Sequence, residues 1–278
     1  MNVTILGCGY VGKAVAQLWQ QQGLTVTVTT TQPERLPELS ALASRAVVVQ
    51  GDDAEALRAL LADQQALLVS LGARNRSLYA ETYLATAQTL VQVLPSSLQQ
   101  IIYTSSYAVY GDHQANWVTE DSLIAPANEN GKILAETEQI LLSVTDQVTN
   151  QVANQVNICV LRLGGIYGPG RELIKIFGST AGQPRAGDGN EASNWVHLDD
   201  IVGAVEFARA QQLNGIYNLV QTEPITAGKL LEQLFATHNL PSVIWDKNQA
   251  STRAYNARVS NQKIRDAGYQ FLHPVIEP

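Results

Sequence analysis

Residues 2–16 read Asn2-Val-Thr-Ile-Leu-Gly-Cys-Gly-Tyr-Val-Gly-Lys-Ala-Val-Ala16, and this stretch decides the fold. Its first five residues are typical of a buried strand, and the apolar spacing after the third glycine is typical of an amphipathic helix. A Gly-x-Gly-x-x-Gly turn lies between them. This succession predicts the phosphate-binding corner of a dinucleotide-binding sheet, with a tight turn that holds no ligand as the alternative.

Each glycine of the turn has its own role in such a corner. Gly7 permits the tight bend, Gly9 lets the backbone approach a pyrophosphate, and Gly12 lets the helix pack against the strand. Around Tyr10 and Val11 the helix begins, and its N–H groups and positive dipole end favour phosphate binding there. We therefore predict that these five residues contact the cofactor.

Short apolar runs alternate with helical periodicity through most of the chain. The expected strands cover residues 2–6, 25–30, 46–50, 66–71, 100–105 and 157–163. The expected helices cover residues 11–22, 53–63, 78–94 and 130–144. Alternation of this kind predicts an α/β fold with a doubly wound parallel sheet, in which ligands bind at the carboxyl ends of the strands.

The pattern loosens after Gly168-Pro-Gly170, where two more helices are expected at 199–212 and 227–238. We predict a dinucleotide-binding domain over residues 1–167 and a smaller substrate-binding lobe over 168–278. Within that lobe, residues 195–212 are expected to pack back on the first domain. The polar-polar-Val pattern of 145–157 predicts a helix end and a solvated connection.

Composition narrows the range of partners. Forty-five per cent of the 278 residues are hydrophobic, and the net charge is −7 without any Lys/Arg run, so we expect binding to neither nucleic acid nor membranes. Cys8 and Cys159 lie in or beside apolar strands and are expected as reduced thiols. The four histidines have no metal-binding spacing, which predicts no metal site. Because the first residues enter a strand at once, we expect no signal peptide and a cytoplasmic protein.

The end of the second strand bears on the choice of cofactor. An acidic residue there normally binds the adenosine ribose of NAD, but this chain has Thr30, with Arg35 shortly after it. Hydroxyl and guanidinium groups bind a 2′-phosphate, and no carboxylate repels one. We therefore predict NADP in preference to NAD, with a merely solvated Arg35 as the alternative.

Two further strand ends are expected at the cofactor. Asp52 follows the third strand and is placed to meet the adenine edge, or to cap the helix expected at 53–63. Leu71 and Gly72 follow the fourth strand and are expected to contact the cofactor at the same edge of the sheet.

Three more stretches, together with the glycine turn and Lys132, carry a family resemblance. They are Ile101-Ile-Tyr-Thr-Ser-Ser-Tyr-Ala-Val-Tyr-Gly111, Leu161-Arg-Leu-Gly-Gly-Ile-Tyr-Gly-Pro-Gly-Arg171 and Gly187-Asp-Gly-Asn-Glu-Ala-Ser-Asn-Trp-Val-His-Leu-Asp-Asp200. Their order resembles that of the extended short-chain dehydrogenases/reductases, also described as the NAD-dependent epimerase/dehydratase family. The resemblance implies a Rossmann fold, a nicotinamide cofactor and a small hydroxyl- or carbonyl-bearing substrate. It also implies a homodimer built on helices 78–94 and 130–144, with the use of both helices within one subunit as the alternative.

The resemblance also implies roles for single residues. Ser106 matches the residue that holds the substrate oxygen, and Lys132 matches the lysine that holds the nicotinamide ribose and lowers the pKa of a catalytic tyrosine. Asn128 stands where that tyrosine is usual, and a neutral amide has no proton to transfer near pH 7. Gly165, with Tyr167 two residues on, is expected to line the nicotinamide side.

The missing phenol leaves two interpretations. In one, Tyr83 or Tyr107 replaces it as the proton carrier of an atypical oxidoreductase or epimerase/dehydratase-like enzyme. In the other, both tyrosines only pack, and the protein is a non-catalytic NADP-binding sensor or regulatory protein.

The substrate is less well defined. Ser193 stands where nucleotide-sugar enzymes of the family often have an arginine, so such a substrate is not indicated. Alternative phosphate partners are Arg171, Arg185, Arg253 and Arg258. His197, Asp199 and Asp200 are expected to cap and position helix 199–212 rather than to catalyse.

Overall fold

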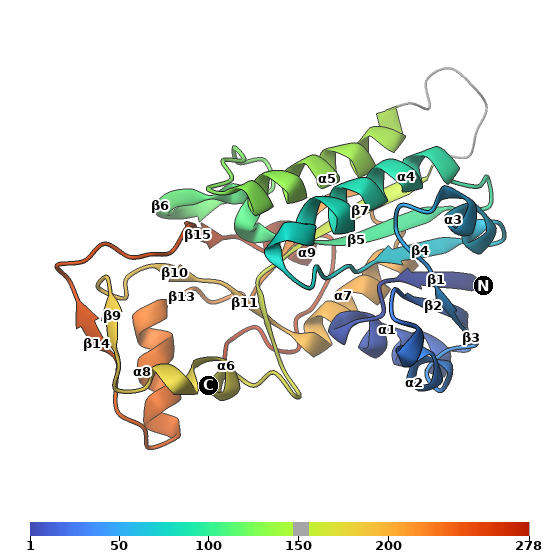
Figure 1. Ribbon diagram of the computed structural model, residues 1–278. Helices are drawn as coiled ribbons and strands as arrows, with labels where there is room; N and C mark the ends of the chain where they lie inside the picture. The colour runs from blue at the N-terminus through green and yellow to red at the C-terminus, as the bar shows by residue number, and fades with distance from the viewer. Residues whose placement is uncertain (147–155, 278) are drawn as a thin grey trace. The chain divides into compact units, whose positions relative to one another are not determined.

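A parallel sheet of seven strands forms the centre of the fold. The structure is a computed structural model that describes residues 1–146 and 156–277 (Figure 1). The strand order is β12-β7-β5-β4-β1-β2-β3. The bounds are β1 Asn2–Leu6, β2 Thr25–Thr30, β3 Arg45–Val48, β4 Ala66–Val69, β5 Gln100–Ser106, β7 Asn157–Leu163 and β12 Gly215–Leu219.

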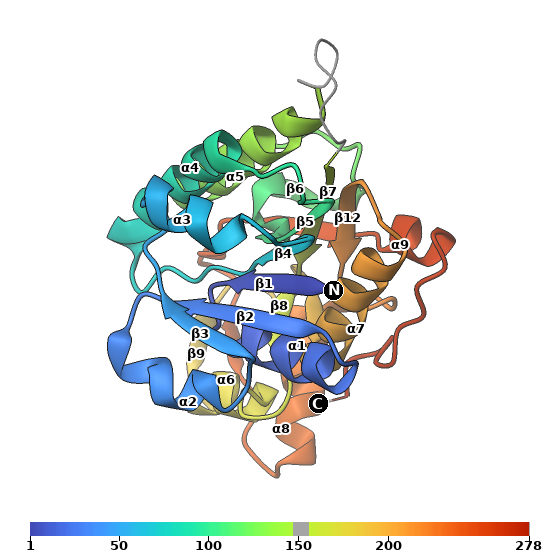
Figure 2. The ribbon, with the colours of Figure 1, turned by 90° about the vertical axis from the view of Figure 1, so that its right-hand side faces the viewer.

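Helices cover both faces of this sheet. Figure 2 shows α3, α4 and α5 along one face and α1 and α7 along the other. Their bounds are α1 Tyr10–Gln21, α2 Leu36–Ser40, α3 Ala54–Leu61, α4 Thr86–Val93, α5 Glu129–Asp146 and α7 Leu198–Ala210. The predicted doubly wound α/β fold is confirmed. Within the described ranges, no helix combines the length and apolar character needed to cross a membrane.

The central strands of this sheet are buried on both faces. All four residues of β4 are buried, and in β1 only the first residue is not. Such continuous apolar strands are typical of sheets covered by helices on both sides. Chain order reverses between β1 and β4, so the crevice at their carboxyl ends is the expected ligand site of this fold class.

The chain forms two compact units, each made of three stretches. The first contains Met1–Ser105, Lys132–Arg162 and Val202–Tyr217; the second contains Ser106–Gly131, Leu163–Ile201 and Asn218–Pro278. The sequence predicted one division between residues 167 and 168. The units alternate along the chain because the segment between β5 and α5 belongs to the second unit, and most of α7 belongs to the first.

The second unit is built from short strand pairs and three helices. Its strands are β6 Asp112–Val118, β8 Gly165–Tyr167, β9 Pro184–Ala186, β10 Ala192–Ser193, β11 Trp195–His197, β13 Ile225–Thr226, β14 Ile244–Asp246 and β15 Asn256–Val259. The helices are α6 Leu173–Phe177, α8 Ala227–Thr237 and α9 Gln262–Asp266. The apolar face of α8, with Leu230, Leu234 and Phe235, packs with Tyr167 and Leu173 in its core.

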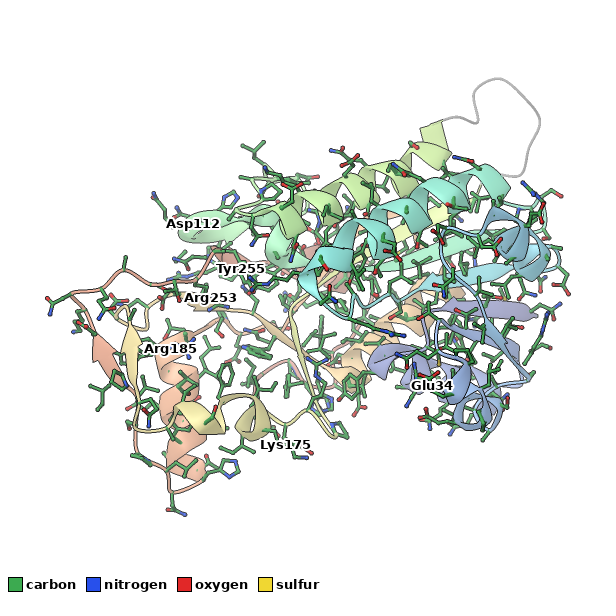
Figure 3. All side chains as sticks on the ribbon, in the orientation of Figure 1. Glu34, Asp112, Lys175, Arg185, Arg253 and Tyr255 are labelled. Atoms are coloured by element: carbon green, nitrogen blue, oxygen red, sulfur yellow. The ribbon has the colours of Figure 1, made fainter. Side chains whose placement is uncertain are left out.

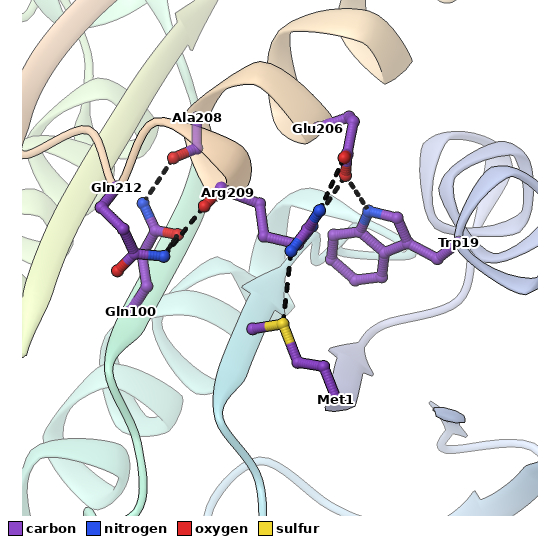
Figure 4. A network of polar contacts seen from close by, with 7 residues as sticks. All are labelled: Met1, Trp19, Gln100, Glu206, Ala208, Arg209 and Gln212. Carbon is purple, nitrogen blue, oxygen red and sulfur yellow. Dashed lines mark hydrogen bonds and ion pairs between the residues drawn. The ribbon is translucent and has the colours of Figure 1, made fainter. Parts of the chain in front are cut away.

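Within the first unit, polar contacts join the carboxyl-terminal part of α7 to α1 and β5 (Figure 4). Trp19 donates its indole N–H to Glu206 at 2.9 Å, and Arg209 holds the same carboxylate. On the other side of the helix, the buried side chain of Gln100 donates to the carbonyl of Ala208 at 2.8 Å. These bonds satisfy buried polar groups, as a helix packed on a sheet requires.

The structure differs from the expected elements in several places, among them the short strands and helices of the second unit. The helix expected at 78–94 begins as a π-helix, Ala80–Ala85, and continues as α4. The edge strand β12 was not predicted, because its Gly-Ile-Tyr-Asn-Leu sequence is too short and polar for a strand signal. The connection predicted within 145–157 lies largely outside the described residues. Both cysteines are buried, and they form no disulfide with each other.

A buried ion pair joins α5 to β7. Arg162 donates from Nε and Nη2 to the carboxylate of Glu138, the shortest contact being 2.7 Å. Ser105 at the end of β5 donates to the same carboxylate at 2.5 Å. Both charged side chains are almost fully buried. A buried charge is tolerated only when it is paired and hydrogen-bonded, so each partner depends on the other.

We predict that Arg162→Met destabilises the protein by about 3–5 kcal/mol, because the Glu138 carboxylate is then buried without its cation. Arg162→Met combined with Glu138→Leu is expected to recover most of this loss. Urea denaturation measures both. A loss below about 1 kcal/mol in the single variant would contradict the prediction.

Candidate cofactor and active site

A cavity of about 420 Å³ opens at the carboxyl ends of β1, β2, β3 and β4. It lies at the point where strand order reverses, as expected for a ligand site. Its walls are Leu6, Gly7, Cys8, Gly9, Thr29, Thr30, Thr31, Gln32, Arg35, Val49, Gln50, Gly51, Asp52, Ser70, Leu71, Gly72, Arg74, Leu78, Glu81, Thr82 and Thr86. Seven of the predicted cofactor residues are among them: Gly7, Gly9, Thr30, Arg35, Asp52, Leu71 and Gly72.

The three glycines of the turn differ in what surrounds them. A Cβ on Gly7 would lie 2.5 Å from the carbonyl oxygen of Ser70, and one on Gly12 would lie 2.7 Å from that of Gly7. Neither site admits a side chain. Around Gly9 no atom lies within 4 Å of a Cβ position. Its φ of −89° and ψ of −147° lie outside the regions that other residues favour, so the backbone of the turn favours glycine there, and a bound phosphate group gives a second reason.

The amino end of α1 completes the phosphate corner. The helix begins at Tyr10, and no side chain caps it. Thr29 fixes the turn in front of it by accepting a hydrogen bond from the N–H of Gly7 at 3.0 Å. Tyr10 and Val11 supply the first helical turn and do not line the cavity. Their expected contact with a cofactor is therefore through the backbone.

Two arginines flank the end of β2. Arg35 donates to the carbonyl of Cys8 at 2.8 Å. Arg74 reaches Thr31 Oγ1 at 3.4 Å. Glu38 lies 3.7 Å from Arg35, but its closest cation is Lys13, whose hydrogen bond lowers the pKa of the carboxyl. Sequence reasoning missed Arg74. Its position shortly after a strand at the switch point was the available signal.

Asp52 lines the cavity and does not cap α3. The cap is Asp53, whose side chain accepts a hydrogen bond from the N–H of Ala56 at 3.0 Å. The capping alternative for Asp52 is therefore wrong by one residue. Its neighbour Gly51 is required for packing, because a Cβ there would collide with the side chain of Thr86.

Asn128 has a local structural role. Its Oδ1 accepts a hydrogen bond from the N–H of Gly131 at 2.9 Å, at the beginning of α5. An asparagine in this place stabilises a helix start. Lys132 follows in the first turn of α5 with an exposed side chain, and it does not line the cavity. Its contact with a ribose stays a prediction.

Ser106 ends β5. Its Oγ accepts a hydrogen bond from the N–H of Ala108 at 3.2 Å, which caps the short helix Tyr107–Tyr110. The hydroxyl group retains a proton to donate, so this capping is compatible with holding a substrate oxygen.

Tyr83 and Tyr107 are both buried phenols. Tyr83 lies on the π-helix and donates weakly to the carbonyl of Leu71 at 3.4 Å, and burial raises its pKa. Tyr107 accepts a hydrogen bond from Arg253 at 3.0 Å and packs edge-on against Tyr255. Burial raises the pKa of Tyr107 to about 12, and the guanidinium of Arg253 opposes that shift.

Packing within the second unit requires glycine at position 165. A Cβ on Gly165 would lie 2.7 Å from the ring of Trp195, because β8 and β11 run side by side. Tyr167 is buried in the core of this unit, and burial raises its pKa to about 12. The contact of Gly165 with a nicotinamide stays a prediction.

The expected capping of α7 is only partly correct. His197 Nδ1 accepts a hydrogen bond from the N–H of Asp199 at 3.2 Å. Asp200 is fully buried and instead accepts hydrogen bonds from the N–H groups of Leu272 and His273, at 2.6 and 2.9 Å. The carboxylate of Asp200 is therefore bound by a segment remote in sequence and does not cap α7.

The remaining predicted phosphate partners have other contacts. Arg185 lies over the ring of Trp245, and Arg253 over that of Tyr255; both arginines are labelled in Figure 3. Ser193 is buried and accepts a hydrogen bond from the indole of Trp195.

Comparisons with known proteins identify the family of this chain. The sequence model of the NAD-dependent epimerase/dehydratase family matches residues 3–219. Protein YeeZ of Escherichia coli K12 is 34% identical over 228 residues, covering 78% of this chain and 77% of that protein. The chain therefore belongs to the NAD-dependent epimerase/dehydratase family, a family of enzymes, and the resemblance to extended short-chain dehydrogenases/reductases is confirmed.

Solved structures share the fold at low sequence identity. A UDP-glucuronic acid 4-epimerase from Bacillus cereus, in complex with UDP-glucuronic acid and NAD, has a TM-score of 0.78 and 18% identity, covering 100% of this chain and 95% of that one. Human epimerase family protein SDR39U1 with NADPH has a TM-score of 0.76 and 18% identity, covering 99% and 96%. Neighbours of this fold thus carry either dinucleotide.

We predict that Gly9→Ala lowers the free energy of unfolding by only about 1 kcal/mol, since its Cβ enters open space and only the backbone angles oppose it. The same methyl group obstructs phosphate approach, so dinucleotide affinity is expected to fall at least about tenfold. Urea denaturation and calorimetric titration with NADP measure the two effects. Gly12→Ala is the contrasting variant, expected to lose stability by overpacking. Unchanged affinity in Gly9→Ala would contradict this role of the turn.

Proposed function

We propose that the protein is an NADP-dependent oxidoreductase that reduces a small carbonyl compound or oxidises the matching alcohol. The observation that carries the proposal is the cleft of the first unit. There the turn leaves open space at Gly9, Arg74 reaches the hydroxyl of Thr31, and Arg35 lines the same cavity. Gly7, Gly9 and the first turn of α1 would hold the pyrophosphate, and a bound NADPH supplies the hydride.

Three features support NADP over NAD. Thr30 ends β2 and Thr31 follows it, where a ribose-binding carboxylate is usual. Arg74 reaches Thr31 and Arg35 lines the same cavity, and guanidinium binds phosphate through paired, charge-assisted hydrogen bonds. Gln32, which forms hydrogen bonds with Arg74 when its amide is turned, places a third polar group at the same edge.

Arg74→Gln is expected to weaken NADP binding about 10- to 100-fold and to leave NAD binding nearly unchanged. Loss of one charged hydrogen bond typically costs about 1.5–3 kcal/mol. Calorimetric titration with each dinucleotide measures the ratio of Kd values. Arg76→Gln is the matched control, because Arg76 is exposed nearby and does not line the cavity. NAD binding more tightly than NADP in the unmodified protein would reject the preference.

For the proton, we propose Tyr107 as the carrier, with Ser106 holding the substrate oxygen and Lys132 holding the ribose. Tyr107 follows directly on β5, and Arg253 stands beside its hydroxyl as a fixed cation. A phenol with a pKa of about 12 stays protonated at neutral pH, so its role is that of an acid in carbonyl reduction. The hydride would go to the carbonyl carbon and the phenol proton to its oxygen, and Arg253 would stabilise the resulting phenolate.

We expect Tyr107→Phe to lower kcat by about 10²–10⁴, the usual contribution of a positioned general acid. NADPH oxidation against a panel of small aldehydes and ketones identifies a compound that the unmodified protein turns over, and the variant is then assayed with it. Because the pKa of Tyr107 is raised, its contribution should not change between pH 6 and about 9. Tyr83→Phe is the comparison. A larger loss there would assign the proton to Tyr83 instead.

The second candidate is a non-catalytic NADP-binding sensor. The observation in its favour is that Asn128 serves as a helix cap and carries no transferable proton. The two functions separate in one assay. Tight NADPH binding without any oxidation across the carbonyl panel would support the sensor and exclude the proposed reductase within that substrate class.

A further inference from the structure

We propose that His197, Asp199 and His273 form a site for one divalent transition-metal ion such as Zn²⁺. The two histidines lie on different segments of the second unit, at the end of β11 and close to the carboxyl end of the chain. In the part of the chain that the structure describes, their ring nitrogens and the Asp199 carboxylate come within 4.8 Å of one another. The sequence predicted no metal site, because His273 is too remote from His197 for a spacing motif.

Two of the three distances between ligand atoms match tetrahedral coordination. Asp199 Oδ2 lies 3.5 Å from His197 Nδ1 and 3.5 Å from His273 Nε2. Zinc binds nitrogen and carboxylate oxygen at about 2.0–2.2 Å, which sets neighbouring tetrahedral ligands about 3.3–3.5 Å apart. The ligand nitrogens of the two histidines lie within 4.8 Å of each other, so rotation of the imidazole rings completes the geometry. Its fourth position would be left for water, because half of the Asp199 side chain is exposed.

Surrounding contacts hold the ligands in place. Asp200, next to Asp199, accepts hydrogen bonds from the backbone of Leu272 and His273, and Tyr269 donates to its carbonyl at 2.8 Å. These bonds fix the backbone of His273 to the first turn of α7. Supporting hydrogen bonds of this kind orient metal ligands and raise affinity.

One existing contact competes with a metal ion. The N–H of Asp199 donates to His197 Nδ1 at 3.2 Å, using the same lone pair that an ion requires. The contact is long for a hydrogen bond, so a bound ion would displace it at small cost. The histidine rings lie 3.8 Å apart between centroids with 38° between their planes, so a bound ion would also turn the two imidazoles apart.

The ligand set selects the kind of ion. Two imidazoles and one carboxylate suit Zn²⁺, Co²⁺ or Ni²⁺, whereas Mg²⁺ and Ca²⁺ require a shell of oxygen ligands. A bound ion would join the start of α7 to the segment around His273. Its expected effect is to stabilise the carboxyl-terminal part of the second unit, independently of dinucleotide binding.

The test uses untagged full-length protein freed of metal by chelation. Calorimetric titration with ZnCl₂ should give one site per chain with a Kd in the micromolar range or tighter, and no binding of MgCl₂. Cobalt chloride should produce the intense visible absorption of tetrahedral Co²⁺. His273→Gln and Asp199→Asn are each expected to weaken Zn²⁺ binding at least tenfold. Asp199→Asn alters an exposed side chain and should leave the fold intact, as circular dichroism would check.

His238→Gln is the matched control, because His238 is an exposed histidine of the same unit outside the cluster. It should bind Zn²⁺ as the unmodified protein does. The proposal would be overturned if the unmodified protein does not bind zinc. It would also be overturned if Asp199→Asn and His273→Gln each bind zinc as tightly as the unmodified protein. The three side chains would then form only a hydrogen-bonded cluster.

Discussion

The cofactor cleft depends on the close approach of Gly7 to the carbonyl of Ser70. A side chain at Gly7 would lie 2.5 Å from that oxygen, so only glycine lets β1 turn beside β4. This turn sets the start of α1, and Gly12 then packs the helix against the turn. The cavity at the point where the strand order reverses follows from these two contacts. Gly9 differs, since its surroundings leave room for a side chain, and glycine is favoured there by the backbone angles and by the approach of a ligand.

The proposed chemistry places the proton donor at Tyr107, beside the guanidinium of Arg253, and not at position 128. Asn128 caps α5 and cannot carry a proton, while Tyr107 has a phenol beside a guanidinium. A cation next to a phenol stabilises its anion whether the cation is an ammonium or a guanidinium. Burial opposes this effect, and the outcome at Tyr107 is a pKa of about 12. Such a group suits proton donation better than proton removal, which is why we propose reduction as the favoured direction.

Much of the first unit could be predicted from local sequence. Six strands and the helices on both faces follow from apolar periodicity, and seven expected cofactor residues line one cavity. What the sequence could not reveal depends on packing between distant segments. Arg74 reaches Thr31 only because β4 and β2 flank β1. Asp200 does not cap α7, because its carboxylate binds the backbone of residues 272–273. The alternation of the two units along the chain is likewise invisible to local patterns.

The central claim is that the first unit binds a nicotinamide dinucleotide on the glycine turn, and direct titration of the folded protein tests it. We expect NADPH fluorescence to change saturably with one site per chain, with a Kd in the micromolar range and tighter binding than NADH. Protein that is folded by circular dichroism and that binds neither dinucleotide at millimolar concentration would contradict this account.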